Sequence, residues 1–213
     1  MYYKSSYISK HIYQYRLIYF FMIVLFLIGI IFGSIIVTSM GFIQKQDLFF
    51  YIEQYLEWMV NDSIIESADV FQTALSYHIQ YLILFFLLGI SIIGLPIIWV
   101  LIFIKGIVVG FSVGFFVNQY GWQGLILAAT GIAPQNLFII PIYLIGSSVA
   151  MIFSLGLLKK LIARRTTQTK VQPLIQYCIV FLCLVALSVI AAFIEAYIAN
   201  FAMEKLAAWI TSS

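Results

Sequence analysis

Long apolar runs separated by short polar segments dominate the sequence. An α-helix rises about 1.5 Å per residue, so about 20 apolar residues cross the hydrocarbon core of a bilayer. The runs therefore predict transmembrane helices. We expect five of them, at residues 17–37, 79–93, 96–118, 135–158 and 173–200.

Two segments depart from this pattern. Residues 121–133 are apolar but too short to cross, so they are expected to form a re-entrant or interfacial half-helix. Residues 41–78 hold six of the eight acidic residues, and their apolar residues recur at helical spacing in two stretches. Ser63 and Glu66 form a capping box that restarts a helix between those stretches. This segment predicts an extracytoplasmic helical hairpin on the membrane surface.

The composition agrees with a membrane protein. Hydrophobic residues make up 64% of the chain and charged residues only 9%, which is too little polar surface to coat a soluble globule. The sequence thus indicates an all-α, polytopic helical membrane protein with a single integral membrane domain over residues 1–213.

The basic residues predict the orientation. Three lie in the leader before residue 17, and five lie in the loop at 159–172, whereas residues 41–78 contain one. Short cytoplasmic loops are enriched in Lys and Arg. With five crossings, the amino terminus and the 159–172 loop are expected in the cytoplasm and the carboxyl terminus outside it.

Small residues mark expected helix contacts and breaks. Glycines at a spacing of four share one helical face and let a second helix approach closely. The helix-packing candidates are Gly29, Gly33, Gly106, Gly110 and Gly114. Proline lacks an amide hydrogen and disfavours helix at the residue before it. The expected helix breaks are Gly94, Pro96 and Pro134.

A few polar residues fall within the apolar segments, where such groups are costly and usually face a partner or water. The candidates are Lys105, Asn118, Gln135, Asn136 and Glu195. Lys105 and Glu195 either pair with each other or reach opposite interfaces through their side chains. Gln135 and Asn136 either cap the fourth helix or line a polar cavity with Asn118.

Motifs for catalysis are missing from the sequence. It contains no HExxH, GxSxG or Walker motif, and its two histidines, His11 and His78, fall outside the expected bundle. Cys178 and Cys183 are five residues apart on one helix, so they point to different sides. We expect no enzyme, no cofactor, no metal site and no nucleic-acid partner.

Several separated motifs resemble one known family. They are QKQDL at 44–48, LLGISIIGLP at 87–96, KGIVVGFSVGFFVN at 105–118, Gly121 with Trp122, PQNL at 134–137 and EAYI at 195–198. In this order they are similar to stage II sporulation protein M of endospore-forming bacteria, and the resemblance covers roughly residues 17–200.

The resemblance implies a non-enzymatic scaffold of the sporulation septum and engulfing membrane. It implies recruitment of stage II sporulation proteins P and D, which degrade peptidoglycan, and leaves homo-oligomer formation open. We expect docking on the extracytoplasmic hairpin. The candidates there are Phe49, Glu53, Glu57, Asp62, Glu66 and Phe71. The alternative is a small transporter or channel whose polar pathway uses the intramembrane candidates.

Overall fold

The computed structural model describes residues 7–61, 67–162 and 172–199. Its elements are α1 (Tyr7–Gln14), α2 (Arg16–Ser39), α3 (Phe42–Asn61), α4 (Ser67–Ile90), α5 (Gly94–Leu127), the π-helix η1 (Ala128–Ile132), α6 (Ala133–Ile162), α7 (Gln172–Ile194) and the π-helix η2 (Glu195–Ala199). Among the described residues, five helices are long and apolar enough to cross a membrane: α2, α4, α5, α6 and α7. The prediction of an all-α fold with five spans is confirmed.

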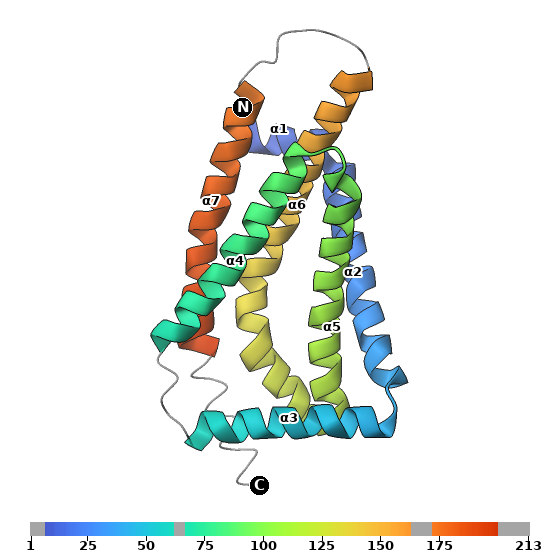
Figure 1. The fold of residues 1–213 in the computed structure, drawn as a ribbon, viewed down its shortest axis with the longest axis vertical. Coiled ribbons are helices and arrows are strands. Elements are labelled where there is room, and N and C mark those ends of the chain that lie inside the picture. Colours follow the sequence, from blue (N-terminus) through green and yellow to red (C-terminus); the bar gives the residue numbers. More distant parts are fainter. Residues whose placement is uncertain (1–6, 62–66, 163–171, 200–213) are drawn as a thin grey trace, which may run out of the picture.

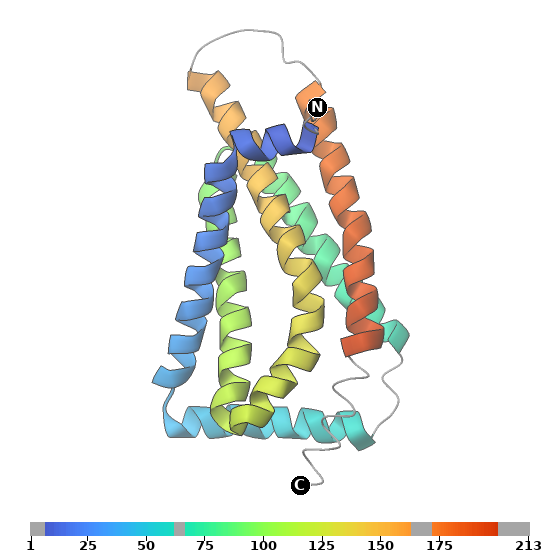
Figure 2. The same cartoon turned by 180° about the vertical axis from the view of Figure 1, so that it is seen from behind.

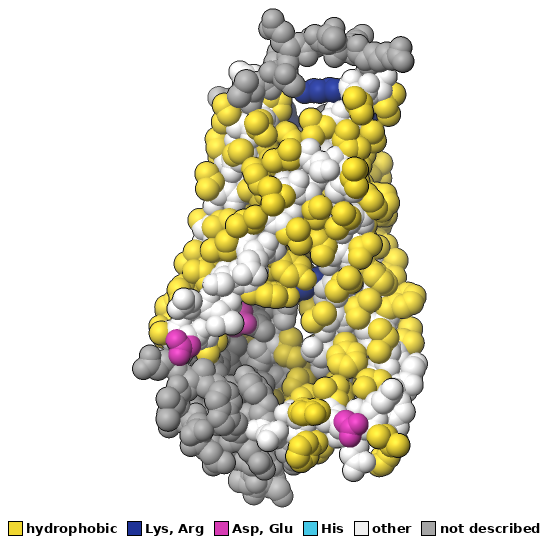
Figure 3. All heavy atoms as spheres, viewed as in Figure 1, with side chains coloured by type: hydrophobic (Ala, Val, Ile, Leu, Met, Phe, Trp, Pro, Cys, Tyr) yellow, Lys and Arg dark blue, Asp and Glu magenta, His cyan; other side chains and the backbone are white. Residues whose placement is uncertain are grey.

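The five long helices form an elongated bundle with the short helix α1 across one end and the longer α3 across the other (Figures 1 and 2). Helix α2 packs along α5, while α4, α6 and α7 pack against one another, and α5 also touches α4 and α6. The core lies where these two groups meet, around Phe85, Ile98 and Tyr143. Apolar side chains cover much of the outer surface, as expected for helices that face lipid (Figure 3).

Four glycines, which we call the glycine seam, hold α2 against α5. The seam consists of Gly29 and Gly33 on α2 and Gly106 and Gly110 on α5. A Cβ added to Gly29 would meet the Phe103 carbonyl oxygen and lie 3.0 Å from the Cα of Gly106. The backbones therefore touch directly. Lipid supplies no hydrophobic drive for helix association, so close contact and dispersion hold such a pair together.

A tight turn joins α4 to α5. The amide of Gly94 donates to the carbonyl of Ser91 at 3.2 Å, and the hydroxyl of Ser154 on α6 donates to the same carbonyl at 2.9 Å. A Cβ on Gly94 would collide with the Leu88 carbonyl, so the turn requires glycine. Pro96 follows within the first turn of α5, where helix amides have no intrahelical acceptor and its missing hydrogen costs nothing.

The second arm of the expected surface hairpin belongs to the membrane bundle instead. Helix α4 begins at Ser67, whereas the second span was expected at residues 79–93. Fifteen residues rise only about 22 Å, which is less than the thickness of the hydrocarbon core. Helix α4 therefore reaches spanning length by including the amphipathic turns before residue 79, which were expected in the surface hairpin. Of the described part of the expected hairpin, α3 is the segment that lies across the end of the bundle (Figure 1).

The chain turns within α5, at Gly121, and the expected break at Pro134 is wrong. Gly121 has φ 56° and ψ −125°, a conformation that costs glycine little. From Trp122 the backbone stays helical through η1 and into α6. The expected half-helix at 121–133 is thus continuous with the fourth span. Pro134 is the second residue after the π turn, close to where the hydrogen-bond spacing changes and its missing amide is accommodated.

Candidate functional site

Polar side chains from four elements meet inside the bundle. His78, with Tyr77 and Tyr81, comes from α4, while Lys105 comes from α5. Tyr143 comes from α6, and η2 places Glu195 at the same level. Ionisable groups inside a membrane bundle are costly and usually mark function, so this polar cluster is the candidate site.

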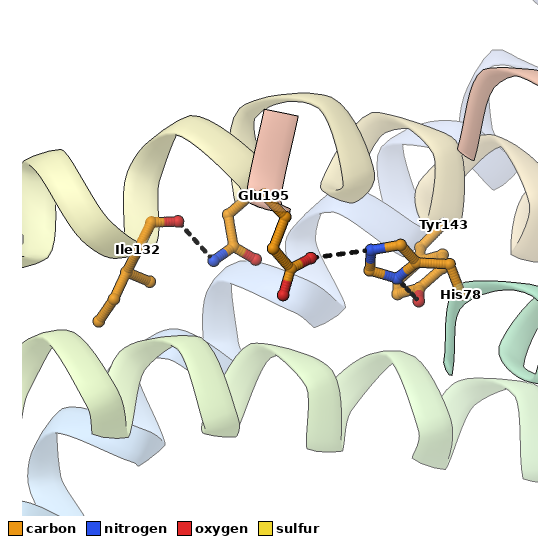
Figure 4. Close-up of polar contacts among 5 residues, drawn as sticks. His78, Ile132, Tyr143 and Glu195 are labelled. Atoms are coloured by element: carbon orange, nitrogen blue, oxygen red, sulfur yellow. Dashed lines mark hydrogen bonds and ion pairs between the residues drawn. The ribbon is translucent and has the colours of Figure 1, made fainter. Parts of the chain in front are cut away.

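His78 forms the centre of a hydrogen-bonded chain (Figure 4). Its Nδ1 lies 3.0 Å from the hydroxyl oxygen of Tyr143, and its Nε2 lies 3.2 Å from Oε2 of Glu195. A carboxylate can only accept, so Nε2 of His78 donates to Glu195, while Nδ1 shares the second hydrogen bond with the Tyr143 hydroxyl. The imidazole is 5% exposed, and this chain gives both of its nitrogens a partner.

Lys105 lies among tyrosine rings. Its ammonium nitrogen is 5.3 Å from the ring centres of Tyr77 and Tyr143 and 5.8 Å from that of Tyr81. The negative face of an aromatic ring attracts a cation at such distances, and the attraction strengthens when water is excluded. The three rings therefore stabilise the buried charge. Tyr81 and Tyr143 also stack on each other, with centroids 5.4 Å apart, which fixes this cage.

A cavity of about 180 Å³ opens beside this cluster. Its lining combines both charges with polar and apolar side chains from α4, α5, η1, α6 and η2. The lining residues are Tyr77, His78, Lys105, Val108, Val109, Ser112, Ile132, Asn136, Ile139 and Glu195. Figure 3 shows the blue of a basic side chain in a hollow of the face between α4 and α5.

Three of the five predicted intramembrane residues line this cavity, namely Lys105, Asn136 and Glu195. Asn118 lies further along α5 and is exposed, so it does not join them. The side chain of Gln135 is outside the described part of the structure. The side chain of Asn136 donates to the Ile132 carbonyl at 2.8 Å, one turn earlier, and so serves the π turn rather than capping the amino end of a helix.

The structure changes the hypothesis about the two membrane charges. Glu195 contacts His78, and the Lys105 ammonium is held over the tyrosine rings rather than reaching the interface. Both charges nevertheless face the same cavity. They belong to one polar cluster, in which the Glu195 carboxylate forms a hydrogen bond with His78.

Sequence reasoning missed His78 and the tyrosine cage. It placed His78 outside the bundle because the second span was begun at residue 79. The signal was present, since Ala74, His78, Leu82 and Phe85 recur at helical spacing and all four are buried. A helix begun one or two turns earlier would have put the histidine on this inward face.

The docking candidates are only partly described. On α3, the ring of Phe49 lies 5.5 Å from that of Tyr120, so it packs against the end of α5. Phe71 is half-buried on α4. Asp62 and Glu66 lie outside the described residues, as do the side chains of Glu53 and Glu57. In the described residues no group of His, Cys, Asp and Glu could hold a metal ion.

The fold and this site define a polytopic helical membrane protein with a charged cluster inside its bundle. The family model described as Stage II sporulation protein M matches residues 22–200. The chain belongs to that family. No curated protein and no solved structure gave a match. Family membership indicates a sporulation-related membrane protein.

Proposed function

We propose that the protein is a non-enzymatic scaffold of the engulfment machinery, which anchors peptidoglycan-degrading partners at the sporulation septum. The family match supports a role in sporulation. The observation that carries the scaffold role is α3, which crosses one end of the bundle and presents aromatic side chains outward. The partners that the motif resemblance implies are stage II sporulation proteins P and D.

Local sequence explains why α3 lies across the bundle. Gln44 accepts a hydrogen bond from the Gly41 amide at 3.1 Å, one half of a capping box, and this starts the helix directly after the turn from α2. Charged residues such as Lys45 and Asp47 keep α3 out of the hydrocarbon core. Phe50 and Tyr51 are 62% and 68% exposed. Large aromatic side chains of this kind are frequent anchors of protein interfaces.

Replacing both Phe50 and Tyr51 with serine is expected to weaken partner recruitment by tenfold or more, since an aromatic anchor contributes about 2 kcal/mol. The measurement is co-purification of the peptidoglycan-degrading partners with the tagged full-length chain from sporulating cells, together with the fraction of engulfed forespores. Tyr13→Ser on α1 is the matched control, because Tyr13 is 73% exposed on the opposite end of the bundle. Unchanged recruitment by the double variant at normal protein levels would place the interface elsewhere.

The proposed orientation puts α3 outside the cytoplasm. Four described basic residues, Lys10, Arg16, Lys159 and Lys160, lie at the α1 end of the bundle. At the α3 end, Lys45 accompanies the acidic residues Asp47 and Asp69 (Figures 1 and 3). Through the positive-inside rule, this distribution supports a cytoplasmic position for α1. With five spans, the carboxyl terminus lies outside.

Labelling of single cysteines tests this orientation. In a background with Cys178 and Cys183 replaced by serine, Gln46→Cys on α3 should react with a membrane-impermeant maleimide in intact protoplasts. Lys159→Cys, at the other end of the bundle, should react only after the membrane is opened. Both positions are exposed, so access rather than burial decides the result. The opposite labelling pattern would invert the topology and remove α3 from the partner side.

The polar cavity favours a second candidate function, a small transporter. Lys105, Asn136 and Glu195 meet at one cavity inside the bundle, where a scaffold has no evident need of charge. The two functions differ in one respect. A scaffold keeps its partners when these residues are neutralised, whereas a transporter loses its flux.

A further inference from the structure

The cavity beside His78 is lined by one cationic and one anionic side chain. Lys105 supplies the positive charge and Glu195 the negative charge, and Nε2 of His78 lies 3.2 Å from the carboxylate. The remaining polar groups of the lining, from Tyr77, Ser112 and Asn136, are uncharged. A guest with a net charge would disturb this balance inside the membrane, where an uncompensated charge costs several kcal/mol.

A zwitterion preserves the balance. Its anionic group is attracted to the Lys105 ammonium on α5, and its ammonium to the Glu195 carboxylate on η2. A carboxylate has about four acceptor positions, so its contact with His78 is compatible with an ammonium nearby. The hydroxyl of Ser112 and the amide of Asn136 add neutral hydrogen-bonding groups to the same lining.

The volume limits the size of the guest. At about 30 Å³ for each water molecule, 180 Å³ holds about six waters, so the guest has roughly six to eight non-hydrogen atoms. Pockets for drug-sized ligands are larger, on the order of 300–1,000 Å³. A small amino acid and an ethanolamine phosphate group both have this size and both carry the required pair of charges.

The cavity opens to the surface of the bundle beside two exposed lining residues. Tyr77 and Val108 both line it and are 46% and 51% exposed, so its mouth lies between α4 and α5. Tyr77 also borders a wider groove along the polar face of α4, which leads toward the α3 end of the bundle. The groove residues are Asp69, Gln72, Thr73, Ser76, Tyr77 and Gln80. A polar guest thus meets polar side chains along its approach.

We propose that this cavity binds a small zwitterion, with its carboxylate or phosphate against Lys105 and its ammonium against Glu195. The guest is either a free amino acid or the ethanolamine phosphate headgroup of a lipid that enters between α4 and α5. This site is independent of the scaffold function, because α3 and its partners take no part in it.

The test uses the full-length chain in nanodiscs of phosphatidylglycerol, which carries no ammonium group. Phosphoethanolamine or alanine should raise the unfolding temperature, whereas inorganic phosphate or ethanolamine alone at equal concentration should not. Adding phosphatidylethanolamine to the nanodisc tests the lipid source. Stabilisation by the lipid alone identifies a headgroup site, and stabilisation by the free compounds identifies a solute site.

Three variants assign the binding to the cavity. Ser112→Leu fills the space without changing a charge, and Lys105→Met removes the cation, so each should raise the Kd at least tenfold. Asn118→Ala on the same helix lies outside the cavity and should bind normally. If the Lys105→Met variant does not fold, the Kd of the Ser112→Leu variant decides whether the cavity is the binding site. Unchanged binding by Ser112→Leu, equally tight binding of phosphate alone, or no binding of any zwitterion, free or lipid, would overturn the proposal.

Discussion

Replacing Gly110 with isoleucine is expected to lower the free energy of unfolding by about 3 kcal/mol or more, the upper range for overpacked cores. A Cβ at this position collides with the backbone carbonyl of Ile30 on α2. A change of rotamer cannot move a backbone carbonyl, so α2 and α5 must separate along the glycine seam. Close backbone contact is what holds helices together in lipid, and that contact would be lost. Thermal unfolding of the purified chain in detergent measures the effect.

Two other glycines provide matched controls. A Cβ on Gly114, one turn further along α5, would lie 3.4 Å from the Cα of Ser34, which is ordinary van der Waals contact. A Cβ on Gly156 of α6 would meet nothing within 4 Å. Gly114→Ala and Gly156→Ala should therefore be neutral or slightly stabilising, because alanine favours helix over glycine. A Gly110→Ile variant as stable as these two would show that the seam does not hold the pair.

The sequence predicted the membrane helices better than it predicted which of them pack against each other. Apolar runs of spanning length indicated four of the five membrane helices, because hydrocarbon thickness fixes helix length, whereas the run expected for the second span, at 79–93, was too short. The spacing of Gly106 and Gly110 indicated a closely packed partner helix. It could not indicate α2 as that partner, because Gly29 and Gly33 give the same pattern and any helix with a small-residue face fits. The partner follows only from the assembled bundle.

The sequence predicted the charged residues of the site but not its tyrosines, and the difference has a physical reason. Lys105 and Glu195 stand out because charge is rare in apolar segments. Tyr77, Tyr81 and Tyr143 do not stand out, because tyrosine is common in this chain and its ring also suits lipid and core. The cage depends on α4 and α6 bringing the rings around one ammonium. The tyrosines of α4 and the tyrosine of α6 are more than 60 residues apart in the sequence, so no local sequence pattern predicts that they meet.

The second large effect is expected for Glu195→Leu, which should cost about 1–3 kcal/mol, less than the loss of one partner of a fully buried charge pair because the Glu195 side chain is 27% exposed. The change takes the negative charge from the cavity and leaves the Lys105 charge uncompensated inside the bundle. It also removes the acceptor of the His78 Nε2 proton, 3.2 Å away. Thermal unfolding in detergent and the yield of folded protein from membranes both measure this cost.

Adding Lys105→Met to Glu195→Leu is expected to recover part of the lost stability. Methionine keeps most of the lysine stem, so the double variant exchanges two opposite charges for apolar groups of similar volume, and that exchange is often nearly neutral in buried sites. Lys105→Met combined with Asn118→Ala is the control, because Asn118 lies outside the cavity and the two costs should simply add. If the costs of Lys105→Met and Glu195→Leu also add, the two charges are not coupled. The tyrosine rings alone would then stabilise the ammonium of Lys105.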